Sequence, residues 1–387
     1  MLRSGIKAVK PAAGSEAVTK AAEIIATGGI AAFPTETVYG LGADAFNPTA
    51  VAGVYAAKGR PGDNPLIMHI ANKSKFFEIA ENPPAYANAL IKAFWPGPLT
   101  LVAKKKPGLP PWVGGHPKGT ADTAGIRMPS HSLALALIEK SGCVVAAPSA
   151  NLAGTPSPTL AEHVASDFVN GEIDFILDGG AVPGGLESTV VDVTGPTPVI
   201  LRPGAITAKM ITEATGLKTE DYYVNVEPPA PNAPAKTSDG CAILDSPDNA
   251  VIPESPIAPP RSPGMKYRHY APKAPMTLLI GSETSIAKYV QNQYAKSQSL
   301  RTGILVTEET EAILCQSLSE SSQVKYITLG RKASPETIAH NLYAALRKFD
   351  TIGVDVIYAE GLPHDGLGIA IMDRMKKAAE GRVVHTS

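Results

Sequence analysis

Twelve prolines fall within the 48 residues from Pro228 to Pro275, and this stretch holds few apolar runs. Such a segment cannot build a hydrophobic core and is expected to run extended over the surface. It therefore divides the 387-residue chain into two folded parts. We predict one domain over residues 1–220, a proline-rich linker over 221–275 and a second domain over 276–387.

Before the linker, short β-rich runs alternate with helical patterns, which indicates an α/β domain. Ile30–Phe33 is typical of a buried strand, and it runs into Pro34. Asn47 and Pro48 are typical of a helix start, and Gly59 of its end. Further strands are expected at 65–70, 99–104, 124–128, 143–147, 173–177, 189–193 and 198–202, with helices at 84–94, 131–141, 159–169 and 207–216.

After the linker the alternation is more regular. Strands are expected at 276–280, 303–307, 324–329 and 354–359, separated by helices near 284–297, 309–318 and 335–349. In the last helix, Ile338, Leu342, Leu346 and Phe349 form one apolar stripe. The pattern predicts a smaller parallel-sheet domain of Rossmann-like type, a fold that does not determine its function.

Charge and cysteine content exclude several classes of protein. Lys and Arg number 35 against 36 Asp and Glu, so the net charge is −1, which argues against a large nucleic-acid footprint but not against a small cationic pocket. No stretch reaches the roughly 18 apolar residues of a membrane span. The three cysteines lie far apart and no secretory signal opens the sequence, so we expect a cytoplasmic protein.

Hydroxyl-bearing and cationic residues gather near the ends of the predicted strands. The segment Pro34–Leu41 directly follows a strand and carries Thr35, with glycines at 40 and 42. It is typical of a small-ligand pocket or of a simple turn. Lys58 and Arg60, held between glycine and proline, suit an anionic ligand, although a solvated helix end would look the same. His69, on an apolar strand, is typical of a core histidine.

Three further segments extend this pattern. Arg127 lies within an apolar strand, where a charge is costly unless a ligand carboxylate or an internal acid pairs with it. The run from Ala147 to Pro158 offers hydroxyls and an amide suited to phosphate oxygens. Glu187-Ser188-Thr189 and Arg202-Pro203-Gly204 complete the set. There is no P-loop, no GxGxxG in a strand–helix context, no HExxH, no CxxC and no GxSxG.

Six segments taken in order closely resemble the motif series of the YrdC/Sua5 family: FPTETVYGLGADAFN, KGRPGDNPLIMHI, FWPGPLTLV, TAGIRMPSH, APSANLAGTPSPT and LESTVVDV…VILRPGAI. The resemblance covers about residues 15–216. SPGMKYRHYAPKAP (262–275) resembles the linker of the longer Sua5 branch, and LGIAIMDRMKKAA (367–379) its second-domain ending. It implies a YrdC-like twisted mixed sheet with flanking helices, followed by the Rossmann-like domain.

The resemblance also implies an activity, in which threonine, bicarbonate or CO2 and ATP give threonylcarbamoyl-AMP and diphosphate for t6A modification of tRNA. Mg²⁺ would bind with ATP, and a threonylcarbamoyl transferase acting on tRNA would take the product. By motif, the threonine end would comprise Thr35, His69, Arg127, Ala147 and Ser188, and the ATP end Lys58, Arg60, Thr123, Ser149, Asn151, Ser157, Arg202, Tyr267 and His269. The linker would close the cleft as a lid. Glu36 stands where Asp or Ser is expected more often, and we expect this departure to matter little.

Two other functions remain open on the sequence. An RNA-binding module would suit a product that serves tRNA, but the near-zero net charge and the lack of basic runs interleaved with aromatic residues count against it. Binding to tRNA is therefore expected to be weak or indirect. A carbamoyl-AMP-forming maturation enzyme carries a related domain, but the cysteine spacing here supports no zinc finger. No metal site or covalent catalytic residue is expected in the chain itself.

Overall fold

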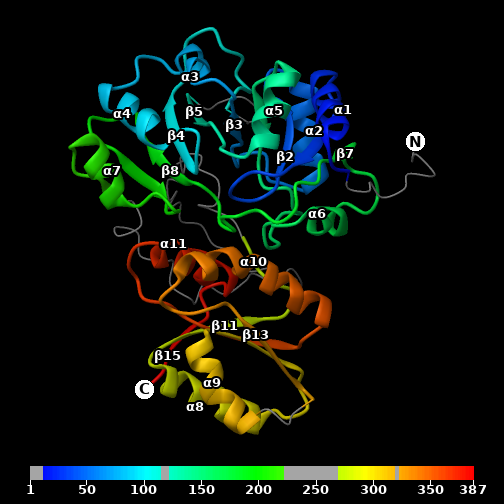
Figure 1. The fold of residues 1–387 in the computed structure, drawn as a ribbon, viewed down its shortest axis with the longest axis vertical. Helices are drawn as coiled ribbons and strands as arrows, with labels where there is room; N and C mark the ends of the chain where they lie inside the picture. The colour runs from blue at the N-terminus through cyan, green and yellow to red at the C-terminus, as the bar shows by residue number, and fades with distance from the viewer. Residues whose placement is uncertain (1–11, 115–121, 222–268, 319–321) are drawn as a thin grey trace, which may run out of the picture.

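The computed structural model describes residues 12–114, 122–221, 269–318 and 322–387. Two sheets organise these residues, and helices cover both (Figure 1). The first sheet contains ten strands and is built from residues before the linker, whereas the second contains five and is built from residues after it. The predicted α/β fold class is therefore confirmed.

The ten-stranded sheet is mixed, with the strand order β10-β9-β8-β4-β5-β3-β6-β2-β1-β7. Its strands are β1 Ala31–Phe33, β2 Gly40–Asp44, β3 Ile67–His69, β4 Leu99–Lys104, β5 Thr123–Arg127, β6 Val145–Ala147, β7 Phe175–Ile176, β8 Thr189–Asp192, β9 Val199–Arg202 and β10 Glu220–Asp221. The helices are α1 Ser15–Ala26, α2 Pro48–Lys58, α3 Ser74–Ile79, α4 Ala85–Phe94, α5 Ser132–Ser141, α6 Ala161–Asp167 and α7 Ala208–Thr215.

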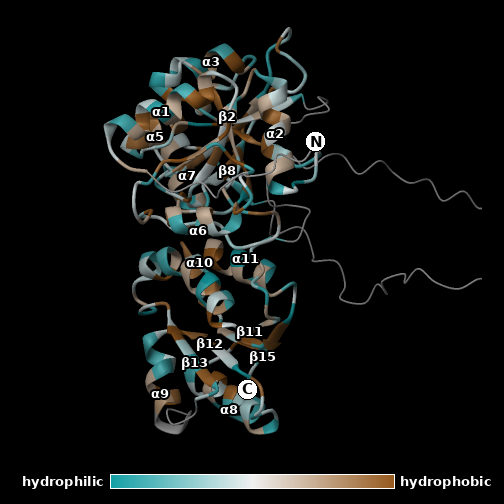
Figure 2. Ribbon diagram, turned by 90° about the vertical axis from the view of Figure 1, so that its right-hand side faces the viewer, coloured by the Kyte–Doolittle hydropathy of each residue, from teal (hydrophilic) through white to brown (hydrophobic). Residues whose placement is uncertain are grey.

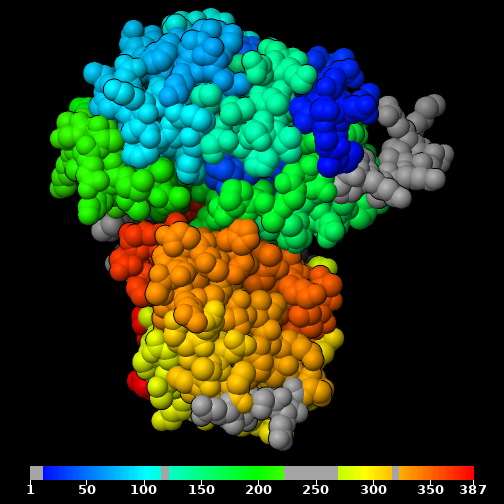
Figure 3. Space-filling model, in the orientation of Figure 1, coloured from blue at the N-terminus to red at the C-terminus, as the bar shows by residue number. Residues whose placement is uncertain are grey.

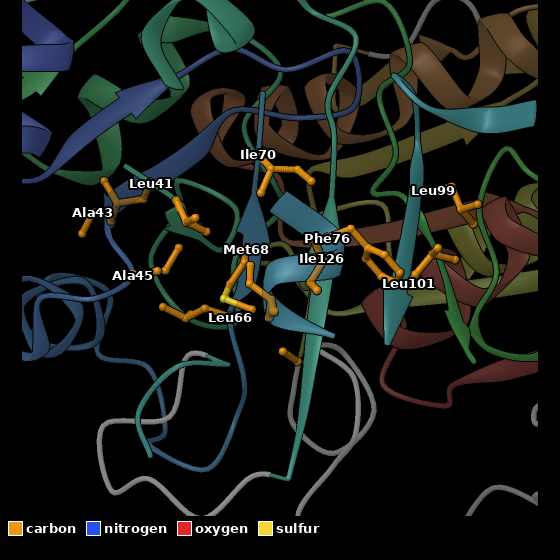
Figure 4. Close-up of a cluster of buried hydrophobic side chains, with 14 of the residues drawn as sticks. Leu41, Ala43, Ala45, Leu66, Met68, Ile70, Phe76, Leu99, Leu101 and Ile126 are labelled. Carbon is orange, nitrogen blue, oxygen red and sulfur yellow. The ribbon is translucent and has the colours of Figure 1, made fainter. Parts of the chain in front are cut away.

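The alternation of side chains along each strand gives this sheet two hydrophobic faces. Ala32 lies in the larger core, whereas its neighbours Ala31 and Phe33 lie in a second core under α1 and α5. In the larger core, side chains from β2, β3, β4 and β5 meet, among them Leu41, Met68, Leu101 and Ile126 (Figure 4). Figure 2 shows the apolar strands inside and the polar helix faces outside.

Helix α2 begins and ends as its sequence predicts. The Asn47 side chain accepts hydrogen bonds from the N–H groups of Thr49 and Ala50, and Pro48 takes the first helical position. Gly59 ends the helix with φ 60°, a left-handed conformation that glycine adopts readily. Lys58, the last helical residue, is thereby placed next to the chain reversal at Gly59.

Strand β2 was not predicted, because its glycines suggested a turn after β1. The structure instead pairs β2 antiparallel with β1. An added Cβ at Gly42 would approach the Phe33 ring and Val145 to 2.7 Å, and one at Gly40 would approach the Phe33 ring to 3.2 Å. The two glycines therefore leave room for Phe33, which overrides the low strand propensity of glycine.

The five-stranded sheet is entirely parallel in the order β13-β12-β14-β11-β15. Its strands are β11 Met276–Ile280, β12 Thr302–Val306, β13 Val324–Thr328, β14 Val356–Glu360 and β15 Val383–His385, and its helices are α8 Glu283–Lys296, α9 Glu308–Leu318, α10 Pro335–Ile352 and α11 Gly368–Ala378. Helices α8 and α9 pack together, while α10 and α11 lie between this sheet and the N-terminal part (Figure 1). Strand β15 and helix α11 were not predicted.

The two parts of the molecule share a hydrophobic core. Val38 and Leu186 from the N-terminal part belong to the same buried cluster as Leu342 of α10 and Met375 of α11. In the space-filling view, α10 and α11 press against the green segment of the N-terminal part (Figure 3). Among the described helices, none is long and apolar enough to cross a bilayer.

Candidate functional site

A pocket with an empty volume of about 820 Å³, which includes open solvent at its mouth, lies where strands β3, β5 and β9 of the ten-stranded sheet end. Among the predicted site residues it is lined by Thr35, Lys58, Arg60, His69, Arg127, Ala147, Ser149, Asn151, Ser188, Arg202 and His269. The structure therefore brings together eleven residues that are separated by up to 234 positions in the chain.

Strand ends supply one wall of this pocket. His69 is the last residue of β3 and Arg127 is the last residue of β5. The two strands are parallel neighbours in which His69 is in register with Arg127, so both side chains reach the same edge of the sheet. Ala147, the last residue of the adjacent antiparallel strand β6, is in register with Ile67 and adds a small side chain to the pocket lining.

The buried guanidinium of Arg127, which is 4% exposed, has an internal acid as a partner. Its Nη2 lies 2.7 Å from the Glu36 carboxylate, and its Nη1 donates a hydrogen bond to Thr37 Oγ1 at 3.0 Å. The Nε donates to the Gly97 carbonyl at 3.3 Å. The pair explains how a charge is tolerated at the end of an apolar strand.

Hydroxyl groups continue from Arg127 along the loop after β1. Thr35 Oγ1 lies 2.8 Å from Thr37 Oγ1 and accepts hydrogen bonds from the N–H groups of Thr37 and Val38. It also donates to the Val38 carbonyl at 2.7 Å. The side chain of Thr35 therefore stabilises the conformation of its own loop, an arrangement that favours a preformed site.

Another part of the pocket wall contains Arg202, which is hydrogen-bonded to Ser188. Its Nε and Nη2 both donate to the Ser188 carbonyl, at 3.2 and 3.0 Å, and Nη2 also contacts Ser188 Oγ at 3.2 Å. Ser188 Oγ lies 2.8 Å from Thr100 Oγ1. Arg202 is the last residue of β9, so another strand end positions another cation.

Lys58 is buried rather than solvated, with 2% exposure, so the interpretation as a solvated helix end is wrong. Its Nζ donates to the backbone carbonyls of Ser149 and Asn151 and thereby ties the end of α2 to the loop after β6. Burial, reinforced by the nearby Arg60, lowers the pKa of Lys58 well below its usual value. A bound anion would reverse this effect by favouring the charged amine.

Arg60 is fixed by backbone carbonyls close in sequence. Its Nε donates to Asn64 at 3.1 Å and its Nη2 to Pro65 at 2.9 Å. Burial lowers the pKa of Arg60 to about 10, so it stays charged at neutral pH. Asn151 donates through Nδ2 to the carbonyls of Leu152 and Thr155, while its Oδ1 has no hydrogen-bond partner in the described structure.

Both histidines of the pocket are neutral at physiological pH. Burial, with the help of Arg127, lowers the pKa of His69 to about 3. Burial, with the help of Arg60 and Lys377, does the same for His269. His69 Nδ1 lies 3.1 Å from the Ile67 carbonyl, which can only accept, so Nδ1 carries the proton and Nε2 is left as an acceptor.

Two predicted residues do not line the pocket, and a third cannot be placed. Thr123 begins β5 and so lies four residues, or about 13 Å, from Arg127 at the other end of that strand. Ser157 is fully buried and donates to the Glu187 carboxylate at 2.6 Å, one layer behind the pocket wall. Tyr267 falls outside the described residues.

The sequence analysis assigned no site role to Glu36, Glu187 or Tyr270. Glu36 is the partner of Arg127, while Glu187 and Tyr270 line the pocket. An acid next to a predicted buried strand, as at Glu187-Ser188-Thr189, is the signal that could have identified the second of these.

The charge balance of the pocket suits a polyanion. Lys58, Arg60, Arg127 and Arg202 line it together with a single carboxylate, that of Glu187. Across the described ranges, no group of three or more His, Cys, Asp or Glu side chains could hold a metal ion. The arrangement can bind a carboxylate and several phosphates side by side, and its neutral imidazoles and hydroxyls can orient small polar groups.

Two family models together match most of the chain. Residues 23–204 match Sua5_yciO_yrdC, described as "Telomere recombination". Residues 206–380 match Sua5_C, described as "Threonylcarbamoyl-AMP synthase, C-terminal domain".

Proteins of similar sequence and structure carry the same description. A threonylcarbamoyl-AMP synthase of Bacillus subtilis is 44% identical over 368 residues, which cover 95% of this chain and 94% of the relative. One of Pyrococcus abyssi is 40% identical over 366 residues, 94% of each chain. The crystal structure of P. abyssi Sua5 complexed with L-threonine superposes with a TM-score of 0.79 at 38% identity, covering 98% of this chain and 99% of that one.

Proposed function

The chain belongs to the YrdC/Sua5 family, in its long form with a Sua5_C domain, and its activity is threonylcarbamoyl-AMP synthesis; on this premise we propose that the pocket has a threonine end and a nucleotide end. The observation that carries the proposal is the pocket itself. Arg127 and His69, at two adjacent strand ends, line the same pocket as Lys58, Arg60 and Arg202, whose charges suit phosphates. Threonine, bicarbonate and ATP are the substrates we assign to it.

The threonine end comprises Thr35, His69, Arg127, Ala147 and Ser188. Arg127 would hold the amino-acid carboxylate, which must share or replace the contact with Glu36. His69 Nε2, the free acceptor, would receive a hydrogen bond from the amine or hydroxyl of threonine. The small side chain of Ala147 would leave room for the substrate.

The nucleotide end comprises Lys58, Arg60, Ser149, Asn151, Arg202 and His269. Lys58 would act as a point charge on phosphate, and the two arginines as planar donors. Thr123, Ser157 and Tyr267 belong to the same assignment by motif, but Ser157 would act through Glu187. Thr123 would reach the ligand only after a rearrangement near residue 122.

The reaction needs positioning and charge stabilisation more than covalent catalysis. The neutral threonine amine attacks CO2, which bicarbonate supplies by losing hydroxide, and the proton released from the nitrogen joins that hydroxide to form water. A carbamate oxygen then attacks the α-phosphorus of ATP. The bond from this phosphorus to the α,β-bridging oxygen breaks, and diphosphate leaves with the electron pair of that bond. Lys58, Arg60 and Arg202 would stabilise the charge that develops on the leaving group. The neutral pocket histidines fit this scheme, because a carbamate is already a nucleophile and needs no strong base.

Mg²⁺ would arrive with ATP rather than reside in the protein. Among the described residues that line the pocket, Glu187 alone carries a carboxylate, and Arg374 already donates a hydrogen bond to it at 2.9 Å. Mg²⁺ is commonly held by substrate phosphates and waters with few protein ligands, which suits these residues. Its role would be to neutralise phosphate charge.

The product would pass to a threonylcarbamoyl transferase that acts on tRNA. A net charge of −1 and cations that face inward to a pocket favour weak or indirect tRNA binding by this chain. The cytoplasm, where tRNA is modified, is the compartment we assign.

Variants at the two ends test this division. Arg127→Ala would leave Glu36 unpaired, so we compare Glu36→Gln with the double variant Glu36→Gln/Arg127→Ala. The double variant should bind threonine more weakly by about 2–5 kcal/mol and retain ATP binding by calorimetry. Lys58→Ala should bind ATP more weakly and retain threonine binding. Equal losses of both ligands in both proteins would contradict the division into two ends.

A further inference from the structure

A buried carboxylate joins the two domains at the pocket. Glu187 lines the pocket and accepts hydrogen bonds from Ser157 Oγ at 2.6 Å, from Tyr343 Oη at 2.9 and 3.1 Å and from Arg374 Nε at 2.9 Å. Ser157 belongs to the N-terminal part, whereas Tyr343 lies on α10 and Arg374 on α11. Two side chains of the C-terminal domain thus donate hydrogen bonds to one residue of the pocket wall.

Arg374 is fully buried, and its charge is balanced by two acids. Besides Glu187, it contacts Asp373 Oδ2 at 2.6 Å, and Asp373 in turn contacts Lys377 at 2.9 Å. Burial by itself would raise the pKa of Glu187, but Arg374, Arg202 and the Ser157 hydroxyl together lower it to about 2. Glu187 is therefore ionised at neutral pH, and removing either member of the pair would leave a buried charge.

The same two side chains contact Tyr270, near the C-terminal end of the linker. The Tyr270 ring stacks on the Tyr343 ring with centroids 5.3 Å apart, and the Arg374 guanidinium carbon lies 5.7 Å from the Tyr270 centroid. The next residue, Ala271, donates its N–H to the Gly154 carbonyl at 3.0 Å. His269 and Tyr270 both line the pocket, so the C-terminal domain supports a second part of its wall.

We propose that Arg374 and Tyr343 are positioning residues for the synthase reaction: from the C-terminal domain they hold Glu187–Ser188 and His269–Tyr270 in the pocket wall. The connection reaches the nucleotide end, because Ser188 is also the residue to which Arg202 donates three hydrogen bonds. This inference rests on the assignment of Arg202 and His269 to ATP. It gives the Rossmann-like domain a role in shaping the active site.

The test uses full-length variants. Arg374→Met removes the charge and keeps much of the buried volume, Arg374→Lys restores the charge, and Tyr343→Phe removes only the hydroxyl while keeping the ring stack. Lys332→Met is the matched control, because Lys332 pairs at 2.7 Å with the buried Glu360 in the same domain but does not line the pocket. For each protein we would measure Tm, kcat and the KM values for ATP and threonine.

We expect Arg374→Met to raise the KM for ATP or lower kcat by about tenfold or more, as a small misplacement of binding groups does. Arg374→Lys should recover part of the loss, and Tyr343→Phe should show a smaller loss. Lys332→Met should lower Tm but leave kcat and both KM values within about twofold of wild type.

A purely structural role for the network would lower Tm in Arg374→Met while leaving kcat and KM unchanged, and this result would overturn the proposal. So would equal kinetic losses in Arg374→Met and Lys332→Met, which would indicate general destabilisation. If Arg374→Met does not fold, unchanged kinetics in Tyr343→Phe decide against it. Failure of the functional assignment is distinguishable, because wild type would then form no threonine-dependent product.

Discussion

The contact between Arg127 and Glu36 shows what the sequence predicts about a buried arginine and what it does not predict. An arginine in an apolar strand requires an anion, and the sequence left open whether a ligand or an internal acid supplies it. In the structure Glu36 does so at 2.7 Å. Glu36 had been expected to matter little, because no local pattern links position 36 to a strand end 91 residues later.

This pair leads to the first prediction at the residue scale. If the threonine carboxylate competes with Glu36 for Arg127, Glu36→Gln should lower the KM for threonine and leave the KM for ATP unchanged. Steady-state kinetics with each substrate varied in turn checks this. A raised KM for threonine would instead show that the Glu36 carboxylate contributes to substrate binding, for example by contacting the amine.

A second residue-scale prediction concerns Lys58. Burial holds its pKa well below the usual value, and a polyphosphate bound next to it would raise that pKa. In the pH range between the two pKa values, ATP binding should therefore be accompanied by proton uptake. Calorimetry in buffers of different ionisation enthalpy measures this uptake directly.

Lys58→Arg provides the control for proton uptake, because arginine stays protonated throughout the accessible range. The dependence of the binding enthalpy on the buffer should be smaller in this variant. An identical dependence in wild type and Lys58→Arg would assign the proton to another group, such as His269.

At the scale of elements, the bounds of the strands along the chain could be predicted better than which strands are neighbours in the sheet. The strands expected at 99–104 and 276–280 correspond to β4 and β11 with the same bounds, because apolar and β-branched runs between turn residues are a local signal. Strand β2 was missed for the opposite reason. Its glycines are explained only by Phe33 on the neighbouring strand, which is a tertiary contact.

Strand β2 also supports a stability prediction. Gly42→Ala would place a Cβ 2.7 Å from both Phe33 and Val145 and should destabilise the protein by about 1–3 kcal/mol. Thermal unfolding of the purified variant checks this. Gly62→Ala is the control, because no heavy atom lies within 4 Å of its added Cβ, and its Tm should be unchanged or slightly higher. A normal Tm for Gly42→Ala would contradict the close packing of β1, β2 and β6.

At the scale of the whole molecule, the proline-rich segment predicts a division into two folded parts but gives no indication of how they meet. The motifs placed eleven residues in one pocket because family resemblance and strand ends both point to the same edge of the sheet. They could not show that Tyr343 and Arg374, 156 and 187 positions after Glu187, donate hydrogen bonds from the other domain to this residue of the pocket wall. Such contacts depend on the docking of two folded units, which leaves no local pattern.

The central claim is that this chain joins threonine, CO2 and ATP in the pocket formed by its N-terminal part with His269 and Tyr270. The most direct test incubates the full-length protein with threonine, bicarbonate, Mg²⁺ and ATP and follows diphosphate release together with mass-spectrometric detection of the adenylate. We predict diphosphate release that depends on threonine and on bicarbonate, and a product with the mass of threonylcarbamoyl-AMP. Diphosphate release without threonine, or an adenylate that lacks the carbamoyl group, would contradict the account.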